Sequence, residues 1–269
     1  MTLLLPPLHL LQASAPSSGS PAWLATVVAL AALAAIAAIR RLAADFGGDL
    51  ALAAEHRLAG LYLRLLHRAR LEGFERIEGL ANLAGDAGGA GRGLIVAANH
   101  TCGLDPVLLQ MLVRRRIRWM MWTGQMAPAL GWLWRHLEVL PVEQDGRDLQ
   151  TVRAAVRALD RGEVLGIFPE GGIARPPGQV QAFQPGLGLL ASRSSAPVLL
   201  CLVRGTPAPR VGGSFLLPSR SKVIAVGLYR VEPGERPNAF LERMRQSLIE
   251  ASGWPAAESL TGPAAAVPR

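Results

Sequence analysis

The segment Asn99 to Pro106 holds residue types that can move a proton. His100 precedes Asp105 by five positions, a spacing that a short loop can fold so that the carboxylate reaches the imidazole. An imidazole whose Nδ1 donates to a carboxylate is held in one tautomer, and its Nε2 can then take a proton from a hydroxyl. We therefore predict His100 as a general base that Asp105 orients. A structural loop in which Asp105 caps the following helix is the alternative, and the spacing alone does not decide between them.

A second candidate segment, residues 166–172, reads Gly-Ile-Phe-Pro-Glu-Gly-Gly. It presents one carboxylate, Glu170, at the end of an apolar run. Gly171 and Gly172 allow backbone amides to approach a ligand closely, and Arg175 follows as a candidate anion partner. We predict that Glu170 and these glycines bind a substrate. A tight turn with a solvated glutamate is the structural alternative.

Cys102 offers a different chemistry, because it lies two residues after His100. A thiol activated by this histidine would be a nucleophile that forms a covalent intermediate. Residues two apart on one loop often point in different directions, which counts against this route. Cys201 is the only other cysteine, so neither a disulfide framework nor a four-cysteine zinc site can form.

Short apolar runs that alternate with helical patterns must position these residues. The alternation predicts an α/β sheet covered by helices. In such sheets, ligands bind beyond the carboxyl ends of the strands, where both candidate segments fall. Strands are expected at 93–98, 118–122, 137–142, 164–168, 198–203 and 223–229, and helices at 106–114, 128–136 and 149–161.

The N-terminal part has a different pattern. Residues 22–39 form an uninterrupted apolar run that ends at Arg40 and Arg41, at the lower length limit for a membrane-spanning helix. A buried or interfacial helix is the alternative. In residues 50–71, leucines and arginines fall on different faces of a helix, which predicts an amphipathic helix. This helix either packs on the protein or rests on an anionic lipid surface. We expect a flexible N-terminus at 1–21, membrane-associated helices at 22–72, a catalytic domain at 73–252 and a disordered tail at 253–269.

Charge narrows the set of partners. The net charge is +8, and every basic residue except Lys222 is an arginine. A basic surface suits anionic lipid or phosphate-bearing substrates such as a pantetheine thioester carrier. We expect no nucleic-acid partner, because the arginines are scattered and no binding motif accompanies them. If residues 22–39 span a membrane, Arg40 and Arg41 place the following domain in the cytoplasm.

Taken in order, these motifs resemble those of the glycerolipid acyltransferase superfamily, whose bacterial members include the 1-acylglycerol-3-phosphate acyltransferases. The resemblance covers roughly residues 73–229, and the ordered set is far more specific than any single motif. The segments that carry it are Asn99-His100, Asp105-Pro106, residues 131–142 with 145–148, Phe168-Pro169-Glu170-Gly171, Gly186, residues 196–198 and Gly205.

The resemblance implies a mixed, largely parallel sheet with an N-terminal membrane-associated helical segment. It also implies a role in phospholipid biosynthesis, at the cytoplasmic face of the cell inner membrane and in contact with membrane lipid. His100 would deprotonate the acceptor hydroxyl, and the alkoxide would attack the thioester of acyl-CoA or an acyl-carrier protein. Glu170 would hold the acceptor. The thioester is a co-substrate, and neither a cofactor nor a metal is implied.

Two positions depart from the family pattern. Members with a phosphate-bearing acceptor usually carry arginines where this chain has Glu143 and Ile173, and Arg147 and Arg175 are the candidate substitutes. The acceptor therefore stays open between 1-acylglycerol-3-phosphate and a non-phosphate lipid such as an amino-acid lipid. A non-catalytic lipid-binding membrane protein is a further alternative. Tryptophan and methionine side chains either line an acyl channel or pack in the core: Trp119, Met120, Met121, Trp122, Met126, Trp132 and Trp134.

Overall fold

The computed structural model describes residues 22–80, 93–143, 149–207 and 214–257. The chain divides into two compact units, Met1–Arg41 and Leu42–Arg269. The expected flexible segment at 1–21 lies outside the described residues, as do Arg147 and residues 258–269 of the expected disordered tail.

The first unit contains most of helix α1 (Ala22–Ala44), an alanine-rich helix without an acidic residue in its first turn. Several of its described apolar side chains are exposed, among them Leu30, Leu33 and Ile36. Of the helices within the described ranges, none combines the length and the apolar character needed to cross a membrane. The transmembrane helix predicted over residues 22–39 is therefore not supported.

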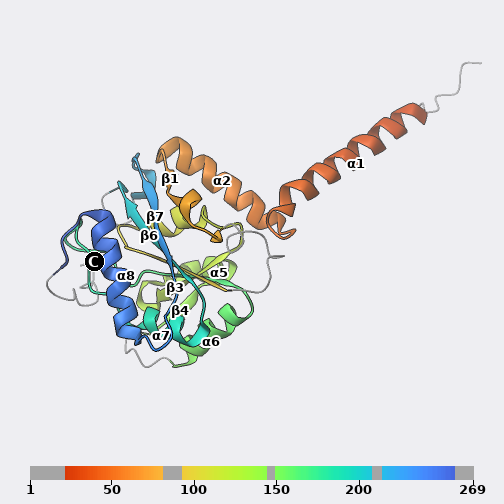
Figure 1. Cartoon of the computed structure of the whole chain (residues 1–269). Coiled ribbons are helices and arrows are strands. Elements are labelled where there is room, and N and C mark those ends of the chain that lie inside the picture. Colours follow the sequence, from red (N-terminus) through yellow and green to blue (C-terminus); the bar gives the residue numbers. More distant parts are fainter. Residues whose placement is uncertain (1–21, 81–92, 144–148, 208–213, 258–269) are drawn as a thin grey trace, which may run out of the picture. The chain divides into compact units, whose positions relative to one another are not determined.

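The second unit is built on one mixed sheet of seven strands within the described residues (Figure 1). Five neighbouring strands, from β6 to β4, run parallel to one another. Strand β7 pairs antiparallel with β6, and β1 pairs parallel with β7. The expected mixed, largely parallel sheet is confirmed. In spatial order the strands are β1 (Arg70–Glu72), β7 (Lys222–Tyr229), β6 (Val198–Arg204), β2 (Leu94–Ala98), β5 (Val164–Ile167), β3 (Ile117–Trp122) and β4 (Leu140–Val142).

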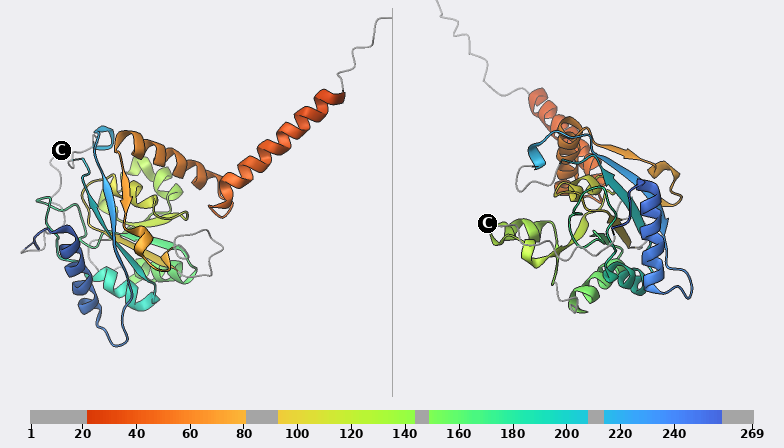
Figure 2. Two further views of the ribbon diagram at one scale, coloured as in Figure 1. Left: turned by 45° about the horizontal axis from the view of Figure 1, so that its top comes forward. Right: turned by 90° about the vertical axis from the view of Figure 1, so that its left-hand side faces the viewer.

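Helices cover both faces of this sheet, as the left view of Figure 2 shows for α2 and α8. One face packs against α6 (Leu149–Asp160), α7 (Pro185–Ser194) and α8 (Pro237–Ser252). The other face packs against α2 (Leu50–Leu66) and α4 (Asp105–Gln110). All five side chains of β2 are fully buried and point alternately into the two cores, as expected for a central parallel strand.

Several element boundaries differ from the expectations. Helix α2 ends at Leu66, because Arg68 takes a left-handed conformation and the Ala69 amide bonds back to the Leu63 carbonyl. The chain then enters β1, whose first two residues were expected to belong to the helix at 50–71. Residues 128–136 form two short helices, η3 (Pro128–Leu130) and α5 (Gly131–His136).

The start of the expected disordered tail is ordered. The Val180 amide donates to the Pro255 carbonyl, and the Ala257 amide donates to the Val180 carbonyl, both at 3.0 Å. The alanine- and proline-rich composition suggested disorder, but these backbone bonds hold Pro255 and Ala257 against the domain. The prediction was therefore too broad for residues 253–257.

Candidate active site

Two loops meet at the carboxyl ends of neighbouring strands. Strands β2 and β5 pair in parallel, with Ala97 opposite Ile167, so the residues that follow each strand emerge side by side. The Ala174 amide donates to the His100 carbonyl at 2.9 Å and joins the second loop to the first. The sheet topology thus brings the segment around His100 and the segment around Glu170 into one site.

His100 and Asp105 form the pair that the sequence predicted. The Nδ1 atom of His100 lies 2.8 Å from Oδ2 of Asp105, and the side chain of Asp105 is fully buried. A carboxylate in this position favours the tautomer that carries its proton on Nδ1. Within the described part of the chain, Nε2 of His100 has no hydrogen-bond partner, and 15% of the side chain is exposed. The imidazole can therefore accept a proton at Nε2.

Asp105 does not cap the helix that begins with it. Its Oδ2 accepts hydrogen bonds from the backbone amides of Thr101 and Cys102, which precede the helix. Its Oδ1 accepts from the Thr101 hydroxyl at 2.8 Å. These donors hold the carboxylate beneath the imidazole, so the geometry favours orientation of His100 over helix capping.

Asn99 and Thr101 tie the histidine loop to β6, which the sequence analysis did not foresee. The side-chain amide of Asn99 donates to the Val203 carbonyl at 2.9 Å and accepts from the Val203 amide at 2.7 Å. The Thr101 hydroxyl lies 2.7 Å from that of Thr206, which follows β6. The residues around His100 are therefore anchored on both neighbouring strands. The sequence carried one signal for this anchor: Asn99 is a polar residue at the end of an apolar strand, directly before His100.

Aromatic rings support the imidazole from one side. The ring of Phe168 stacks on His100, with 3.9 Å between centroids and 10° between planes. Trp119 of β3 stacks on Phe168 at 4.8 Å and 12°. Trp119 lies over Gly166, where an added Cβ would come within 2.5 Å of the indole ring. Phe168 belongs to a motif that is visible in the sequence, but its contact with His100 joins residues 68 positions apart and has no local sequence signal.

Glu170 is buried at the base of the site, with 5% exposure. Its Oε2 accepts a long hydrogen bond of 3.4 Å from the His100 amide, and Oε1 has no hydrogen-bond partner among the described residues. Burial raises the pKa of Glu170 to about 7, although the backbone amides of His100 and Gln181 oppose the shift. The alternative of a tight turn with a solvated glutamate therefore does not fit, and the contact of Glu170 with a substrate stays a prediction.

The two glycines after Glu170 lie nearer the surface. Gly171 is exposed, and its φ of +76° favours glycine because side chains rarely adopt this conformation. An added Cβ at Gly172 would meet nothing within 4 Å. The backbone of this turn is thus open to a ligand.

Cys102 is a poor nucleophile in this geometry. The residue is fully buried, and its Sγ points to Oδ1 of Asp105 at 3.7 Å. Burial and the nearby Asp105 charge raise the pKa of the Cys102 thiol to about 11. A thiolate is therefore disfavoured here, and the imidazole Nδ1 that could activate a thiol is already bonded to Asp105.

The role of Arg147 and Arg175 as anion partners stays a prediction. Arg175 is exposed, and Arg147 lies outside the described residues. Glu143, which follows β4, accepts a hydrogen bond from the Thr123 hydroxyl at 3.1 Å. Of the tryptophans, Trp119 is buried against Phe168, whereas Trp132 is 62% exposed on α5.

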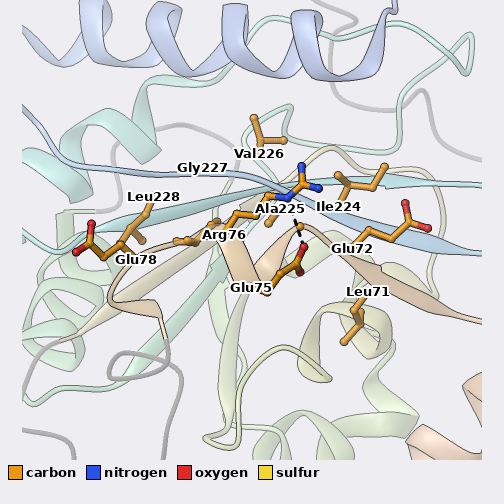
Figure 3. A pocket seen from close by; sticks show the side chains of 12 residues that line it. Leu71, Glu72, Glu75, Arg76, Glu78, Ile224, Ala225, Val226, Gly227 and Leu228 are labelled. Atoms are coloured by element: carbon orange, nitrogen blue, oxygen red, sulfur yellow. Dashed lines mark ion pairs between the residues drawn. The ribbon is translucent and has the colours of Figure 1, made fainter.

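A groove of about 970 Å³ lies away from these residues (Figure 3). It runs between β7 and the segment formed by β1 and the short helix η1 (Phe74–Arg76), and Arg76 extends along it toward Ala225. Glu75 forms an ion pair with Arg76 at 3.5 Å. None of the predicted site residues lines this groove, so its size does not make it the candidate active site.

Two comparisons with known proteins found a similarity to acyltransferases. Residues 73–204 match the family model described as Acyltransferase. The structure is similar to the crystal structure of the 1-acyl-sn-glycerophosphate (LPA) acyltransferase, PlsC, from Thermotoga maritima, with a TM-score of 0.55 and 20% sequence identity. The match covers 78% of this chain and 83% of that chain, and at this identity it shows a shared fold. No curated protein matches this sequence.

Proposed function

We propose that this chain, which belongs to the glycerolipid acyltransferase superfamily through its acyltransferase domain at residues 73–204, moves a fatty acyl group from a thioester to a lipid hydroxyl. The observation that carries the proposal is the pairing of His100 with buried Asp105, which leaves Nε2 free at the carboxyl end of β2. A general base needs this combination of a fixed tautomer and an open nitrogen.

The transfer needs one base and no covalent enzyme intermediate. Nε2 of His100 takes the proton of the acceptor hydroxyl as its oxygen attacks the thioester carbonyl carbon. The tetrahedral intermediate then collapses, the carbon–sulfur bond breaks, and the imidazolium returns the proton to the leaving thiolate. Asp105 holds the Nδ1–H throughout and stabilises the imidazolium. The donor is acyl-CoA or an acyl-carrier protein, and the reaction requires neither a cofactor nor a metal.

The acceptor approaches from the Glu-Gly-Gly turn. The Gly171 amide already donates to the Phe168 carbonyl at 3.0 Å, so Gly172 is the glycine of this turn that faces the acceptor, and Glu170 supports the turn and the His100 loop from below. A lysophospholipid such as 1-acylglycerol-3-phosphate is the first candidate, with Arg147 and Arg175 as partners of its phosphate. A non-phosphate lipid, such as an amino-acid lipid, is the second, because the Glu143 carboxylate would repel a phosphate near the end of β4.

A membrane surface would supply such acceptors. On α2, Leu58, Leu61 and Leu65 are exposed to 69%, 54% and 72%, and Arg57 and Arg64 are exposed on the same helix. Exposed leucines beside arginines suit a helix that rests on anionic lipid. We propose that α2 contacts lipid and that the protein acts in phospholipid biosynthesis at the cytoplasmic face of the cell inner membrane.

The test is acyl transfer by the purified full chain in detergent. Labelled acyl-CoA and labelled acyl-carrier protein are each offered with a panel of 1-acylglycerol-3-phosphate, other lysophospholipids and amino-acid lipids, and the acylated product is identified. We expect one acceptor class to be acylated and His100→Ala to abolish transfer while the protein stays folded by circular dichroism.

The variants separate the alternatives. Unchanged turnover in His100→Ala would refute the general-base role, and lipid binding without transfer in the wild-type protein would favour a non-catalytic lipid-binding protein. Cys102→Ser should keep its activity, because the thiol takes no part in the transfer. For Asp105→Asn, kcat should fall by about 10⁴-fold with little change in donor affinity, as expected for an orienting carboxylate.

A further inference from the structure

One side of the His100 ring is covered by a continuous stack of aromatic rings from two other strands. Phe168 follows β5 and lies face to face with the imidazole, 3.9 Å away and within 10° of parallel. Trp119 of β3 lies behind Phe168 at 4.8 Å and 12°. Residues from three adjacent strands, β2, β5 and β3, thus form one column of rings with the imidazole at its open end.

Hydrogen bonding alone does not fix the direction of Nε2. The hydrogen bond of 2.8 Å between Nδ1 and Asp105 holds one point of the imidazole ring. The ring could still rotate about this bond, so packing must restrict the rotation. A flat ring stacked within 10° restricts this rotation, because tilting the imidazole would drive it into the face of Phe168. The hydrogen bond to Asp105 and the plane of the Phe168 ring together define the direction of Nε2.

We propose that Phe168, backed by Trp119, is the positioning residue that sets the plane of the His100 imidazole for the transfer. This inference rests on the proposed function, in which Nε2 is the reacting atom. Phe168 touches the base rather than the substrate, so it acts through His100. The stack also places a ring face against the imidazolium that forms when Nε2 takes the acceptor proton, and ring faces attract cations.

Gly166 shows that the column depends on close packing behind it. A Cβ at Gly166 would lie 2.5 Å from Cε3 of Trp119, so even an alanine must displace the indole ring. Trp119 is 8% exposed and has little free space to move into. Gly166→Ala therefore perturbs the stack from behind and changes neither an aromatic residue nor the His100–Asp105 pair.

The test combines kinetics with nuclear magnetic resonance of the full chain in detergent. Phe168→Leu should lower kcat by about tenfold or more with little change in KM, because the substrates still bind but meet a misdirected base. In ¹⁵N-histidine-labelled protein at alkaline pH, the wild-type His100 ring should be a single Nδ1–H tautomer, with its carbon-bound protons shifted upfield by the stacked rings. Phe168→Leu should lose the upfield shift but keep the Nδ1–H tautomer, because Asp105 still holds Nδ1, and Gly166→Ala should change the shift in the same direction.

Controls separate positioning from general stability. Phe183→Leu makes the same substitution at a partly buried phenylalanine that packs in the core on the opposite face, and it should leave the His100 signals and kcat unchanged. Phe168→Tyr keeps a flat ring and should restore the wild-type spectrum and most of the rate. His100→Ala assigns the resonances.

Two results would overturn the inference: wild-type His100 signals in Phe168→Leu, or a kinetic loss in Phe168→Leu that appears in KM alone. Failure of the proposed function is a separate outcome. If the wild-type protein transfers no acyl group, the spectra still report whether Phe168 sets the plane of the imidazole.

Discussion

At the residue scale, two buried carboxyl groups in the same site are held in different ways. Asp105 accepts hydrogen bonds from the Thr101 hydroxyl and from the amides of Thr101 and Cys102, besides its bond to His100. Glu170 receives a long hydrogen bond of 3.4 Å from the His100 amide, and burial raises its pKa to about 7 against the opposing effect of the His100 and Gln181 backbone amides. Neighbouring carboxyls in unlike surroundings can therefore serve different roles, with Asp105 as the orienting carboxylate and Glu170 as a support.

The pKa of Glu170 gives a prediction for stability. The unfolded carboxyl has the ordinary pKa of 4.5, whereas the folded one keeps its proton up to about pH 7. Between these values the folded state binds more protons than the unfolded state, so the free energy of unfolding falls as the pH rises, by up to roughly 3 kcal/mol. Glu170→Gln should remove this part of the pH dependence. Urea unfolding of both proteins across this range measures it, and parallel pH profiles would contradict it.

At the element scale, the neighbours of β2 determine the site. Its carboxyl end is followed by the histidine loop, and β5 on one side is followed by the Phe-Pro-Glu-Gly turn. On the other side, β6 anchors Asn99 directly and Thr101 through Thr206. The Asn99 amide pairs with both backbone groups of Val203, which is fully buried. Asn99 thus extends the pairing of β2 with β6 beyond the last strand residue.

Loss of this side chain should be costly. Asn99→Ala leaves the Val203 amide and carbonyl buried without a partner and should lower the free energy of unfolding by roughly 2–4 kcal/mol. Asn238, exposed at the start of α8, provides the matched control, and Asn238→Ala should change stability by less than about 0.5 kcal/mol. Denaturant unfolding compares the two variants, and equal losses would show that Asn99 has no special structural role.

Much of the sheet could be predicted from the sequence, since buried parallel strands appear as short apolar runs. Strands near 94–98, 164–167 and 198–204 were expected within a residue or two. Helices α7 and α8 were not foreseen, although each begins with a proline in its first turn. Strand β1 was missed because its three residues continue the leucine and arginine pattern of α2.

Within the site, the sequence predicted the residues that bear the chemistry and missed those that hold them. His100 and Asp105 lie five positions apart, so a local pattern can reveal the pair. The contacts of His100 with Phe168, and of Asn99 with Val203, join residues far apart in the chain. Such contacts follow from strand order, which no local pattern encodes.

At the scale of the whole molecule, the chain divides into two units, with the boundary between Arg41 and Leu42. The second unit, from Leu42, contains the entire sheet and both cores. Helix α2 belongs to this unit, since Leu63 is 1% exposed in the core and the His67 ring lies 2.8 Å from the Tyr62 hydroxyl and 2.9 Å from that of Ser219. The membrane-associated region predicted at 22–72 thus includes a helix that is part of the domain core.

Truncation tests this division. Removal of residues 1–41 should leave the melting temperature of the remaining chain unchanged, because its core is complete. Removal of residues 1–66 takes away Tyr62 and Leu63 and should lower the free energy of unfolding by about 3 kcal/mol or more. Thermal and denaturant unfolding monitored by circular dichroism compare the two products. A large loss in the shorter truncation would show that the first unit stabilises the second.

The strand order has a consequence for how such a protein diversifies. The proposed base and its supports sit on central strands, where the spacing between loops is fixed by backbone pairing at about 4.8 Å and is insensitive to surface substitutions. The departure at Glu143 lies at the end of β4, the edge strand. A substitution at the rim of the sheet can therefore change the surroundings of a bound acceptor without changing the spacing of the proposed reacting groups at its centre.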